Sequence, residues 1–170
     1  ITNDDIQPLL TVNKSVVGSD EPVSNFELFV DTTQVYSGDT NGFDAADYVV
    51  SETPDDLYNT VIGGDCLSDG SIELSVGDDK SCTITNTRKT GDITFIKNVN
   101  VGNADPEQWT FDVYKNSVYM DTYDHNESVT LDTGSYTVVE NGPDSYFLDN
   151  ISGTACTGNV IDEVADLEVT

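Results

Sequence analysis

The sequence has few basic residues and no long apolar run. Six Lys and Arg stand against 32 Asp and Glu, which gives a formal net charge of −26. A charge of that sign and size repels nucleic acid and anionic membrane surfaces. No stretch of 18 apolar residues could span a bilayer, and no charged-then-apolar signal segment opens the sequence. We therefore expect a solvated acidic surface, no nucleic-acid partner and no membrane insertion of this segment.

Residues that support catalysis or cofactor binding are also scarce. His125 is the single histidine, and no Ser or Cys motif surrounds it. The acidic clusters lack the ordered spacing of a calcium-binding loop, and no phosphate-binding loop is present. The sequence therefore predicts no enzyme with turnover, no cofactor and no metal site.

An internal repeat is the main feature that the sequence does contain. Segments of the first half reappear at an offset of 83 residues, and then of 88 after an insertion that we place at 124–128. At the offset of 88, Tyr58 aligns with Tyr146. Cys66 corresponds to Cys156 at an offset that is two residues larger. The aligned segments are 10–14 (LTVNK) with 93–97 (ITFIK), 26–30 with 109–113, and 48–52 with 136–140.

The two copies have the pattern of short β-strands. Apolar and polar residues alternate in each aligned segment, and turn residues such as Asn41-Gly42 and Asp69-Gly70 separate the segments. No segment has a convincing helical period. Regular short strands at this spacing predict an all-β sandwich in each copy.

The repeat also predicts the domain boundaries. We expect residues 1–8 to be the tail of a preceding repeat and a linker, 9–89 a complete repeat, and 90–170 a second repeat. The strand Cys82-Thr83-Ile84-Thr85-Asn86 ends the first copy, and the second copy stops before its own version of it. Ile1-Thr2-Asn3 is then the end of the same strand in a preceding unit. The chain would be an excerpt from a longer tandem array.

This reading accounts for the odd number of cysteines. Cys66 and Cys82 lie in one complete unit and can pair, closing a loop of 16 residues that is worth roughly 3 kcal/mol. Cys156 corresponds to Cys66, so its partner is expected beyond Thr170. A free buried thiol at Cys156 is the alternative. Disulfides of this kind favour an oxidising, extracellular setting.

Three polar positions of the repeat, a Lys, a Glu and an Asn, stand out in the predicted core. Lys is scarce, yet Lys14 and Lys97 occupy the same repeat position; Glu52 and Glu140 also match, and Asn86 ends the last strand as Asn3 ends its predecessor. Burial lowers the pKa of a lysine and raises that of a glutamate. A neutral lysine amine is a nucleophile, and a protonated glutamate can polarise an asparagine amide. The predicted product is an amide bond between Lys14 and Asn86.

These motifs resemble those of the SpaA-like prealbumin-fold, Cna B-type repeats of bacterial surface proteins. The motifs are LTVNK and ITFIK, the strands DYVVSE (47–52) and GSYTVVE (134–140), and CTITN (82–86). The resemblance implies tandem Ig-like (prealbumin/Cna B-type) β-sandwich modules, each locked by an isopeptide bond. Lys14 and Asn86 would form the bond and Glu52 would promote it. Lys97 and Glu140 would act in the second unit with an Asn beyond Thr170, and Asn3 would serve the unit before.

The resemblance implies a mechanical function in an extracellular stalk, pilus-like filament or cell-surface adhesin, with neighbouring repeats or like subunits as partners. Three alternatives stay open. Lys14 and Glu52 could form only a buried salt bridge capped by Asn86, with the Cys66–Cys82 disulfide replacing the isopeptide bond. The extra loop 121–128, with Tyr123 and His125, could bind a host receptor or glycan. Residues 1–3 could complete the second unit of a neighbouring chain as a donated strand.

Overall fold

The computed structural model describes residues 6–153, 156–159 and 164–169, with only the backbone given for 156–159 and 164. The chain divides into two compact units, Ile1–Arg88 and Lys89–Thr170. The predicted boundary, between residues 89 and 90, lies one residue from this division. Both units are built from β-strands in several sheets, with two short 3₁₀ turns, Val23–Asn25 and Pro106–Gln108, so the predicted all-β class is confirmed.

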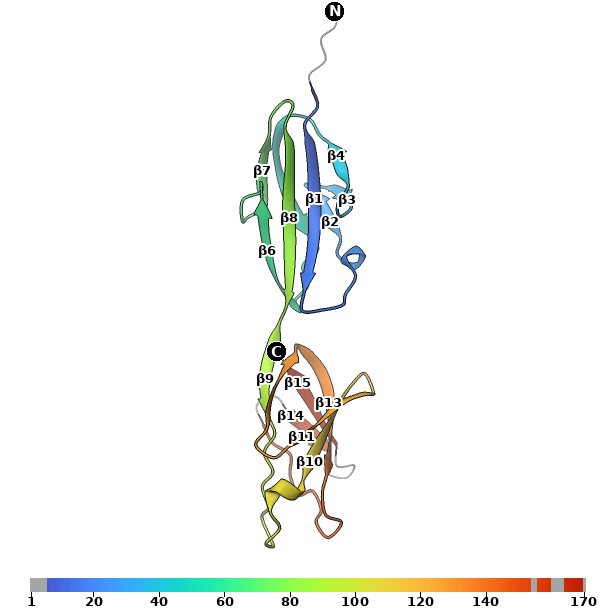
Figure 1. Ribbon diagram of the computed structural model, residues 1–170, viewed down its shortest axis with the longest axis vertical. Coiled ribbons are helices and arrows are strands. Elements are labelled where there is room, and N and C mark those ends of the chain that lie inside the picture. The colour runs from blue at the N-terminus through green and yellow to red at the C-terminus, as the bar shows by residue number, and fades with distance from the viewer. Residues whose placement is uncertain (1–5, 154–155, 160–163, 170) are drawn as a thin grey trace, which may run out of the picture. The chain divides into compact units, whose positions relative to one another are not determined.

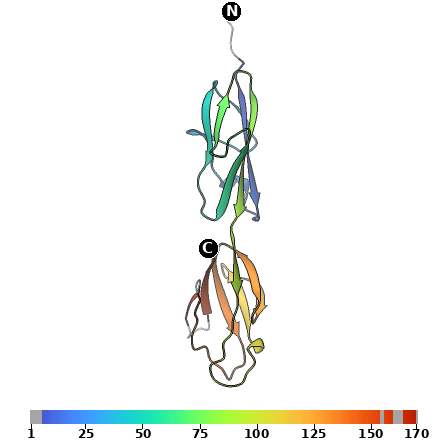
Figure 2. The same ribbon diagram turned by 90° about the vertical axis from the view of Figure 1, so that its left-hand side faces the viewer.

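Unit 1 consists of two four-stranded sheets, in the orders β4-β1-β8-β6 and β3-β2-β5-β7 (Figures 1 and 2). This arrangement is consistent with a β-sandwich. The strands are β1 (Leu9–Val17), β2 (Leu28–Val30), β3 (Thr33–Val35), β4 (Thr40–Gly42), β5 (Ala46–Glu52), β6 (Tyr58–Gly64), β7 (Ser71–Leu74) and β8 (Asp79–Arg88).

The first and last strands of unit 1 are parallel neighbours. β1 pairs with β8 from Leu9↔Asp79 to Val17↔Thr87, nine residue pairs in continuous register. In Figure 1 the two strands run side by side along the unit. Because paired residues of parallel strands point to the same side of the sheet, the even-numbered residues of both strands face inward together. Leu10, Val12, Cys82 and Ile84 among them are buried.

The core of unit 1 lies between its two sheets. Residues from β1 and β8 pack against residues from β2, β3, β5 and β7. The alternation of apolar residues along each strand sends one face of each sheet into this core. The buried members are Leu10, Val12, Leu28, Val30, Val35, Val50, Cys66, Ile72, Leu74, Cys82 and Ile84.

Unit 2 has a five-stranded sheet, β11-β10-β13-β15-β14, and a two-stranded sheet, β12-β9. Its core cluster includes Phe95, Phe111, Tyr136 and Leu167. The strands are β9 (Thr90–Thr94), β10 (Thr110–Lys115), β11 (Val118–Asp124), β12 (Ser128–Asp132), β13 (Gly134–Asn141), β14 (Cys156–Asn159) and β15 (Val164–Val169).

The pairing registers of the two units agree with the sequence repeat. Leu10↔Asn41 in unit 1 corresponds to Ile93↔Val129 in unit 2, and Tyr48↔Ile72 corresponds to Tyr136↔Leu167. Side chains repeat as well. The Thr11–Thr40 hydroxyl contact and the Thr94–Ser128 contact both measure 2.7 Å. The repeat is therefore a repeat of strand pairing and of side-chain contacts.

The predicted position of the insertion, 124–128, is wrong. Leu28 pairs with Val35 in the β2–β3 hairpin, and its counterpart Phe111 pairs with Tyr123 in the β10–β11 hairpin. Tyr123 thus matches Val35, and the five extra residues lengthen the hairpin towards its turn at Asn116-Ser117. A hairpin accommodates added residues at its turn because its base must keep the register of the sheet.

The strand predicted over 93–97 is shorter in the structure, where β9 ends at Thr94. The inward alternation nevertheless continues, since Phe95 is buried and Ile96 is exposed. A groove of about 840 Å³ runs beside this segment, with Ile93, Phe95 and Val138 in its lining. In unit 1 the corresponding strand, β1, has β8 beside it along its whole length. The hypothesis of a donated strand concerns residues 1–3, which lie outside the described residues.

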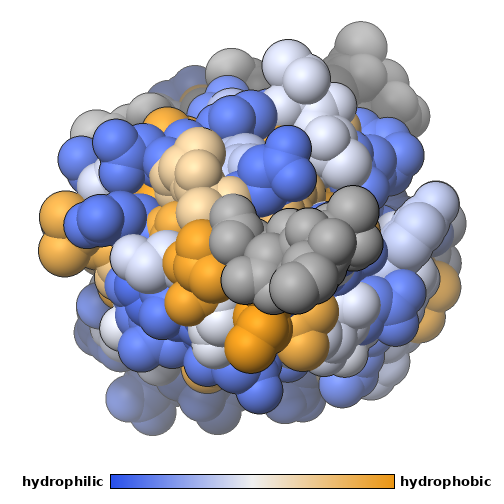
Figure 3. Space-filling view, turned by 90° about the horizontal axis from the view of Figure 1, so that it is seen from above, coloured by the Kyte–Doolittle hydropathy of each residue, from blue (hydrophilic) through white to orange (hydrophobic). Residues whose placement is uncertain are grey.

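The surface seen in Figure 3 is largely hydrophilic, with apolar residues in small groups among the hydrophilic ones. Among the described residues, no helix is long and apolar enough to cross a bilayer.

Candidate functional site

Lys14 lies on the inward face of unit 1. The alternation of β1 places it on the same side as Leu10 and Val12, and its side chain is 0% exposed. Its backbone N–H donates to Oγ of Ser37 at 2.8 Å, which holds the strand at this point. The sequence therefore carries a lysine amine into an apolar core.

Glu52, the last residue of β5, is the ion-pair partner of Lys14. Nζ of Lys14 donates to Oε2 of Glu52 at 2.5 Å, and the Glu52 side chain is only 4% exposed. The Phe26 ring lies 4.6 Å from Nζ. The pair is thus shielded from water, so each charged group depends on the other for stabilisation.

Burial lowers the pKa of Lys14 below its usual value of 10.5. The hydrogen bond and the charge of Glu52 act in the opposite direction, and burial has the larger effect. A lowered pKa makes the neutral, nucleophilic amine more accessible than it is in a solvated lysine.

The lowered pKa predicts how stability depends on pH. The folded state binds the Lys14 proton more weakly than the unfolded state, so the free energy of unfolding should rise with pH between the lowered pKa and about 10.5. The slope is at most about 1.4 kcal/mol per pH unit. Urea unfolding of Asn86→Ala, which keeps Lys14 but offers no amide, should show this rise relative to Lys14→Met/Asn86→Ala. Parallel pH profiles of the two variants would contradict it.

Asn86 is fully buried in β8 at 0% exposure. Its Oδ1 accepts a hydrogen bond from Oγ1 of Thr60 at 2.8 Å. Its Nδ2 has no hydrogen-bond partner among the residues that the structure describes. Leaving a buried amide N–H₂ unsatisfied costs about 1–3 kcal/mol. This cost calls for an explanation that simple packing does not supply.

Thr60, in β6, connects Glu52 to Asn86. It pairs directly with Asn86 across β6 and β8, and Oγ1 also lies 3.1 Å from Oε1 of Glu52. From the sequence, Glu52 was expected to polarise the Asn86 amide itself, and Thr60 was not identified. The one feature of the sequence that could have pointed to Thr60 is its position two residues after Tyr58, on the same side of the strand.

Lys14 and Asn86 lie on the same face of adjacent parallel strands. Val16 pairs with Asn86 and Lys14 with Ile84, so the two residues are offset by two positions. With strands about 4.8 Å apart and a rise of about 3.3 Å per residue, their Cα atoms are about 8 Å apart. A lysine side chain can span this offset.

Unit 2 repeats half of this arrangement. Nζ of Lys97 lies 2.6 Å from Oε1 of Glu140, with side chains 11% and 15% exposed, and the Trp109 ring lies 4.8 Å from Nζ. Trp109 and Tyr146 meet edge to face as Phe26 and Tyr58 do. The Asn partner predicted for Lys97 lies outside the described residues. Asn3, assigned to a preceding unit, lies outside the described residues.

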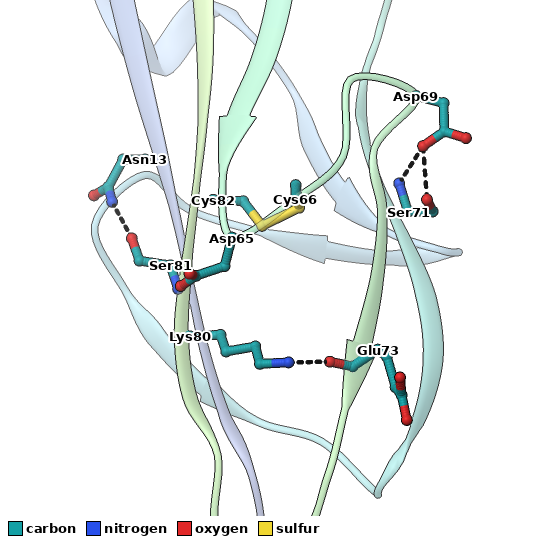
Figure 4. The surroundings of a disulfide bond; sticks show 9 residues. All are labelled: Asn13, Asp65, Cys66, Asp69, Ser71, Glu73, Lys80, Ser81 and Cys82. Carbon is teal, nitrogen blue, oxygen red and sulfur yellow. Dashed lines mark hydrogen bonds between the residues drawn. A yellow bond between two sulfur atoms is a disulfide. The ribbon is translucent and has the colours of Figure 1, made fainter.

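Cys66 and Cys82 form a disulfide in unit 1, with Cα atoms 5.3 Å apart (Figure 4). Both cysteines are buried. The carboxylate of Asp65 accepts a hydrogen bond from the backbone N–H of Ser81 at 2.8 Å, which holds the same two segments together. A disulfide of this kind is typical of an oxidising environment. Cys156 begins β14, and its side chain is outside the described part of the structure.

Tyr123 and His125 do not form a projecting loop. Tyr123 belongs to β11, and its ring stacks on Phe95 at 5.3 Å. Burial raises the pKa of its hydroxyl. Nδ1 of His125 accepts from the backbone N–H of Lys97 at 2.9 Å, which is the contact that Ser37 makes with Lys14. Both residues therefore have structural partners within unit 2.

Comparison of the chain with protein-family models, curated proteins and solved structures gives no match. The structure defines an all-β protein of two repeated units. One of them combines a disulfide with a Lys–Glu–Thr–Asn cluster in which the Lys, Glu and Asn side chains are buried.

Proposed function

We propose that the chain is a structural module of an extracellular stalk, filament or adhesin, in which an isopeptide bond between Lys14 and Asn86 closes unit 1. The observation that carries the proposal is the buried Lys14–Glu52 pair on the same face as Asn86, whose Nδ2 has no hydrogen-bond partner among the described residues. The sequence resemblance to Cna B-type repeats of bacterial surface proteins supports the same chemistry and a place at the cell surface.

The reaction replaces two buried charges and an unsatisfied amide with one neutral amide. Nζ of Lys14 gives a proton to Glu52 and attacks Cγ of Asn86. The Nζ–Cγ bond forms, the Cγ–Nδ2 bond breaks, and Nδ2 leaves as ammonia. Of the three protons on Nζ, one stays on the new amide, one leaves on the ammonia, and one stays on Glu52, which is left as a neutral carboxyl group.

The arrangement of the buried cluster favours this reaction over a permanent salt bridge. A buried ion pair stabilises a fold little, because desolvation of the two charges offsets their attraction. The unpartnered Nδ2 of Asn86 adds a further cost. The reaction removes each of these costs, since Nδ2 is the group that leaves and Oδ1 keeps its hydrogen bond from Thr60.

The β1–β8 pairing suits a module that carries tension. The two strands are parallel, so a pull on Leu9 and Arg88 acts on opposite ends of the pair and loads nine residue pairs in shear. Ladder hydrogen bonds loaded in shear resist together, whereas unzipping breaks them one at a time. A covalent bond between Lys14 and Asn86 would cross this pair of strands. The implied partners are neighbouring repeats of the same chain or like subunits.

The intact mass of the denatured and reduced chain tests the proposal. We expect the wild-type mass to be lower than the sequence mass by one ammonia. Glu52→Ala and Asn86→Ala should each have the full mass expected from their sequences, because one lacks the proton carrier and the other the amide. A wild-type chain at full sequence mass would overturn the proposal and leave Lys14, Glu52 and Asn86 as a buried polar cluster.

A further inference from the structure

We propose that the Thr60 hydroxyl is the group that polarises the Asn86 carbonyl during bond formation, and that proton transfer from Lys14 to Glu52 directs it to that task. This inference rests on the proposed isopeptide function and adds a catalytic residue to it. It was suggested by the position of Thr60, whose Oγ1 lies within hydrogen-bond distance of both Glu52 and Asn86.

The Thr60 hydroxyl has one proton and two acceptors. Oδ1 of Asn86 is 2.8 Å from Oγ1, and Oε1 of Glu52 is 3.1 Å from it. A hydroxyl can donate to only one acceptor at a time. An ionised carboxylate attracts the proton more strongly than a neutral amide oxygen does. The charge state of Glu52 therefore decides which acceptor receives the hydrogen bond.

Proton transfer within the Lys14–Glu52 pair changes that charge state. Oε2 of Glu52 faces Lys14 at 2.5 Å, while Oε1 faces Thr60, so the two oxygens have separate roles. When Lys14 passes a proton to Oε2, the carboxyl becomes neutral and Oε1 becomes a weaker acceptor. The Thr60 proton then turns to Oδ1 of Asn86. The carbonyl is thus polarised at the moment when the amine becomes nucleophilic.

The same hydroxyl stabilises the negative charge that develops on Oδ1. As Nζ attacks Cγ, the carbonyl oxygen gains charge, and a hydroxyl oxygen already at 2.8 Å needs only to rotate its O–H to stabilise it. The Asn86 side chain is fully buried, so water cannot supply this hydrogen bond. The pairing of β6 with β8 places Thr60 directly opposite Asn86, which fixes the geometry.

Among the described residues, the repeat position of Thr60 carries a hydroxyl in unit 1 and none in unit 2. The match of Tyr58 with Tyr146 places Leu148 at the position of Thr60 in the second copy. Lys97 and Glu140 therefore have no counterpart of this hydroxyl, although they repeat the ion pair.

The test compares Thr60→Val and Thr60→Ser in the full chain. Each protein is made by cell-free synthesis, synthesis is stopped, and the intact mass is followed over time. Because loss of one oxyanion donor slows acyl transfer by about 10²–10³-fold, Thr60→Val should lose ammonia slower than wild type by that factor. Thr60→Ser retains the hydroxyl and should react within about tenfold of wild type.

Variants that cannot form the bond separate catalysis from folding. Lys14→Met and Lys14→Met/Thr60→Val should both be folded in the absence of urea, because Thr60 is exposed and Val suits an edge strand. The second should unfold at a lower urea concentration, because Oδ1 of Asn86 loses its hydrogen-bond donor at a cost of about 1–3 kcal/mol. Ammonia loss at the wild-type rate in Thr60→Val would overturn the inference alone, as would a Thr60→Ser rate as low as that of Thr60→Val. Absence of ammonia loss in the wild type would overturn the proposed function, and the inference with it.

Discussion

Pulled from its two ends, the wild-type chain should show no unfolding step from unit 1, whereas Lys14→Met should show a step of roughly 190 Å. With Lys14 bonded to Asn86, tension passes from β1 to β8 through the new amide. Residues 15–85 then lie outside the path of the force and cannot be extended. Without the bond, unit 1 unravels as β1 and β8 separate.

The length of the step follows from the covalent geometry. Leu9 and Arg88 are 79 residue steps apart, of which the Cys66–Cys82 disulfide holds 16. The remaining 63 steps extend to about 220 Å at about 3.5 Å each. The folded β1–β8 pair already spans about 30 Å. Reducing the disulfide in Lys14→Met should lengthen the step by about 55 Å.

Single-molecule force spectroscopy with handles at both ends of the chain measures these steps. Unfolding of unit 2 appears in both proteins and serves as an internal reference. Lys80→Met is a matched control, because Lys80 makes only a partly exposed ion pair with Asp78 and a contact with the Glu73 carbonyl. It should behave as wild type. A wild-type chain with the unit 1 step of Lys14→Met would show that the strands carry load without a covalent bond.

Loss of both covalent links should remove most of the stability of unit 1. The Lys14–Asn86 bond encloses 72 residues and is worth roughly 4 kcal/mol, and the disulfide loop of 16 residues roughly 3 kcal/mol. Together they amount to about 7 kcal/mol, comparable to the whole stability of a typical domain. Lys14→Met/Cys66→Ala/Cys82→Ala should therefore be marginally folded, while either link alone should maintain the fold.

Hydrogen exchange of unit 1 peptides at increasing urea measures this effect. Trp109 is the single tryptophan of the chain and lies in unit 2, so its fluorescence reports whether unit 2 stays folded. Its transition should be the same in all variants. Equal protection of unit 1 in Lys14→Met and wild type would mean that Lys14 contributes no covalent link.

The sequence predicted the strands and the ion pairs well because both follow from local alternation. Lys14 and Glu52 each occupy an inward position on an alternating strand, and the repeat marked the same positions in Lys97 and Glu140. A side chain on the inward face of a sandwich has few neighbours available. The match of positions between the two copies therefore indicates from the sequence which residues form the contacting pairs.

Thr60 could not be predicted because its role depends on strand register. Its partner Asn86 is 26 residues away, and the β6–β8 pairing that brings them together has no counterpart in the described part of unit 2. The position of the insertion was misjudged for a related reason. The letters Val-Tyr occur at 35–36 and 118–119, but the register of the hairpins matches Val35 with Tyr123.

Tandem mass spectrometry of the reduced and digested chain tests the central claim most directly. The account predicts a branched species in which the peptide containing Lys14 is joined to the peptide containing Asn86, with one ammonia lost and fragments that place the link on these two side chains. Linear Lys14 and Asn86 peptides alone, at full mass, would contradict it.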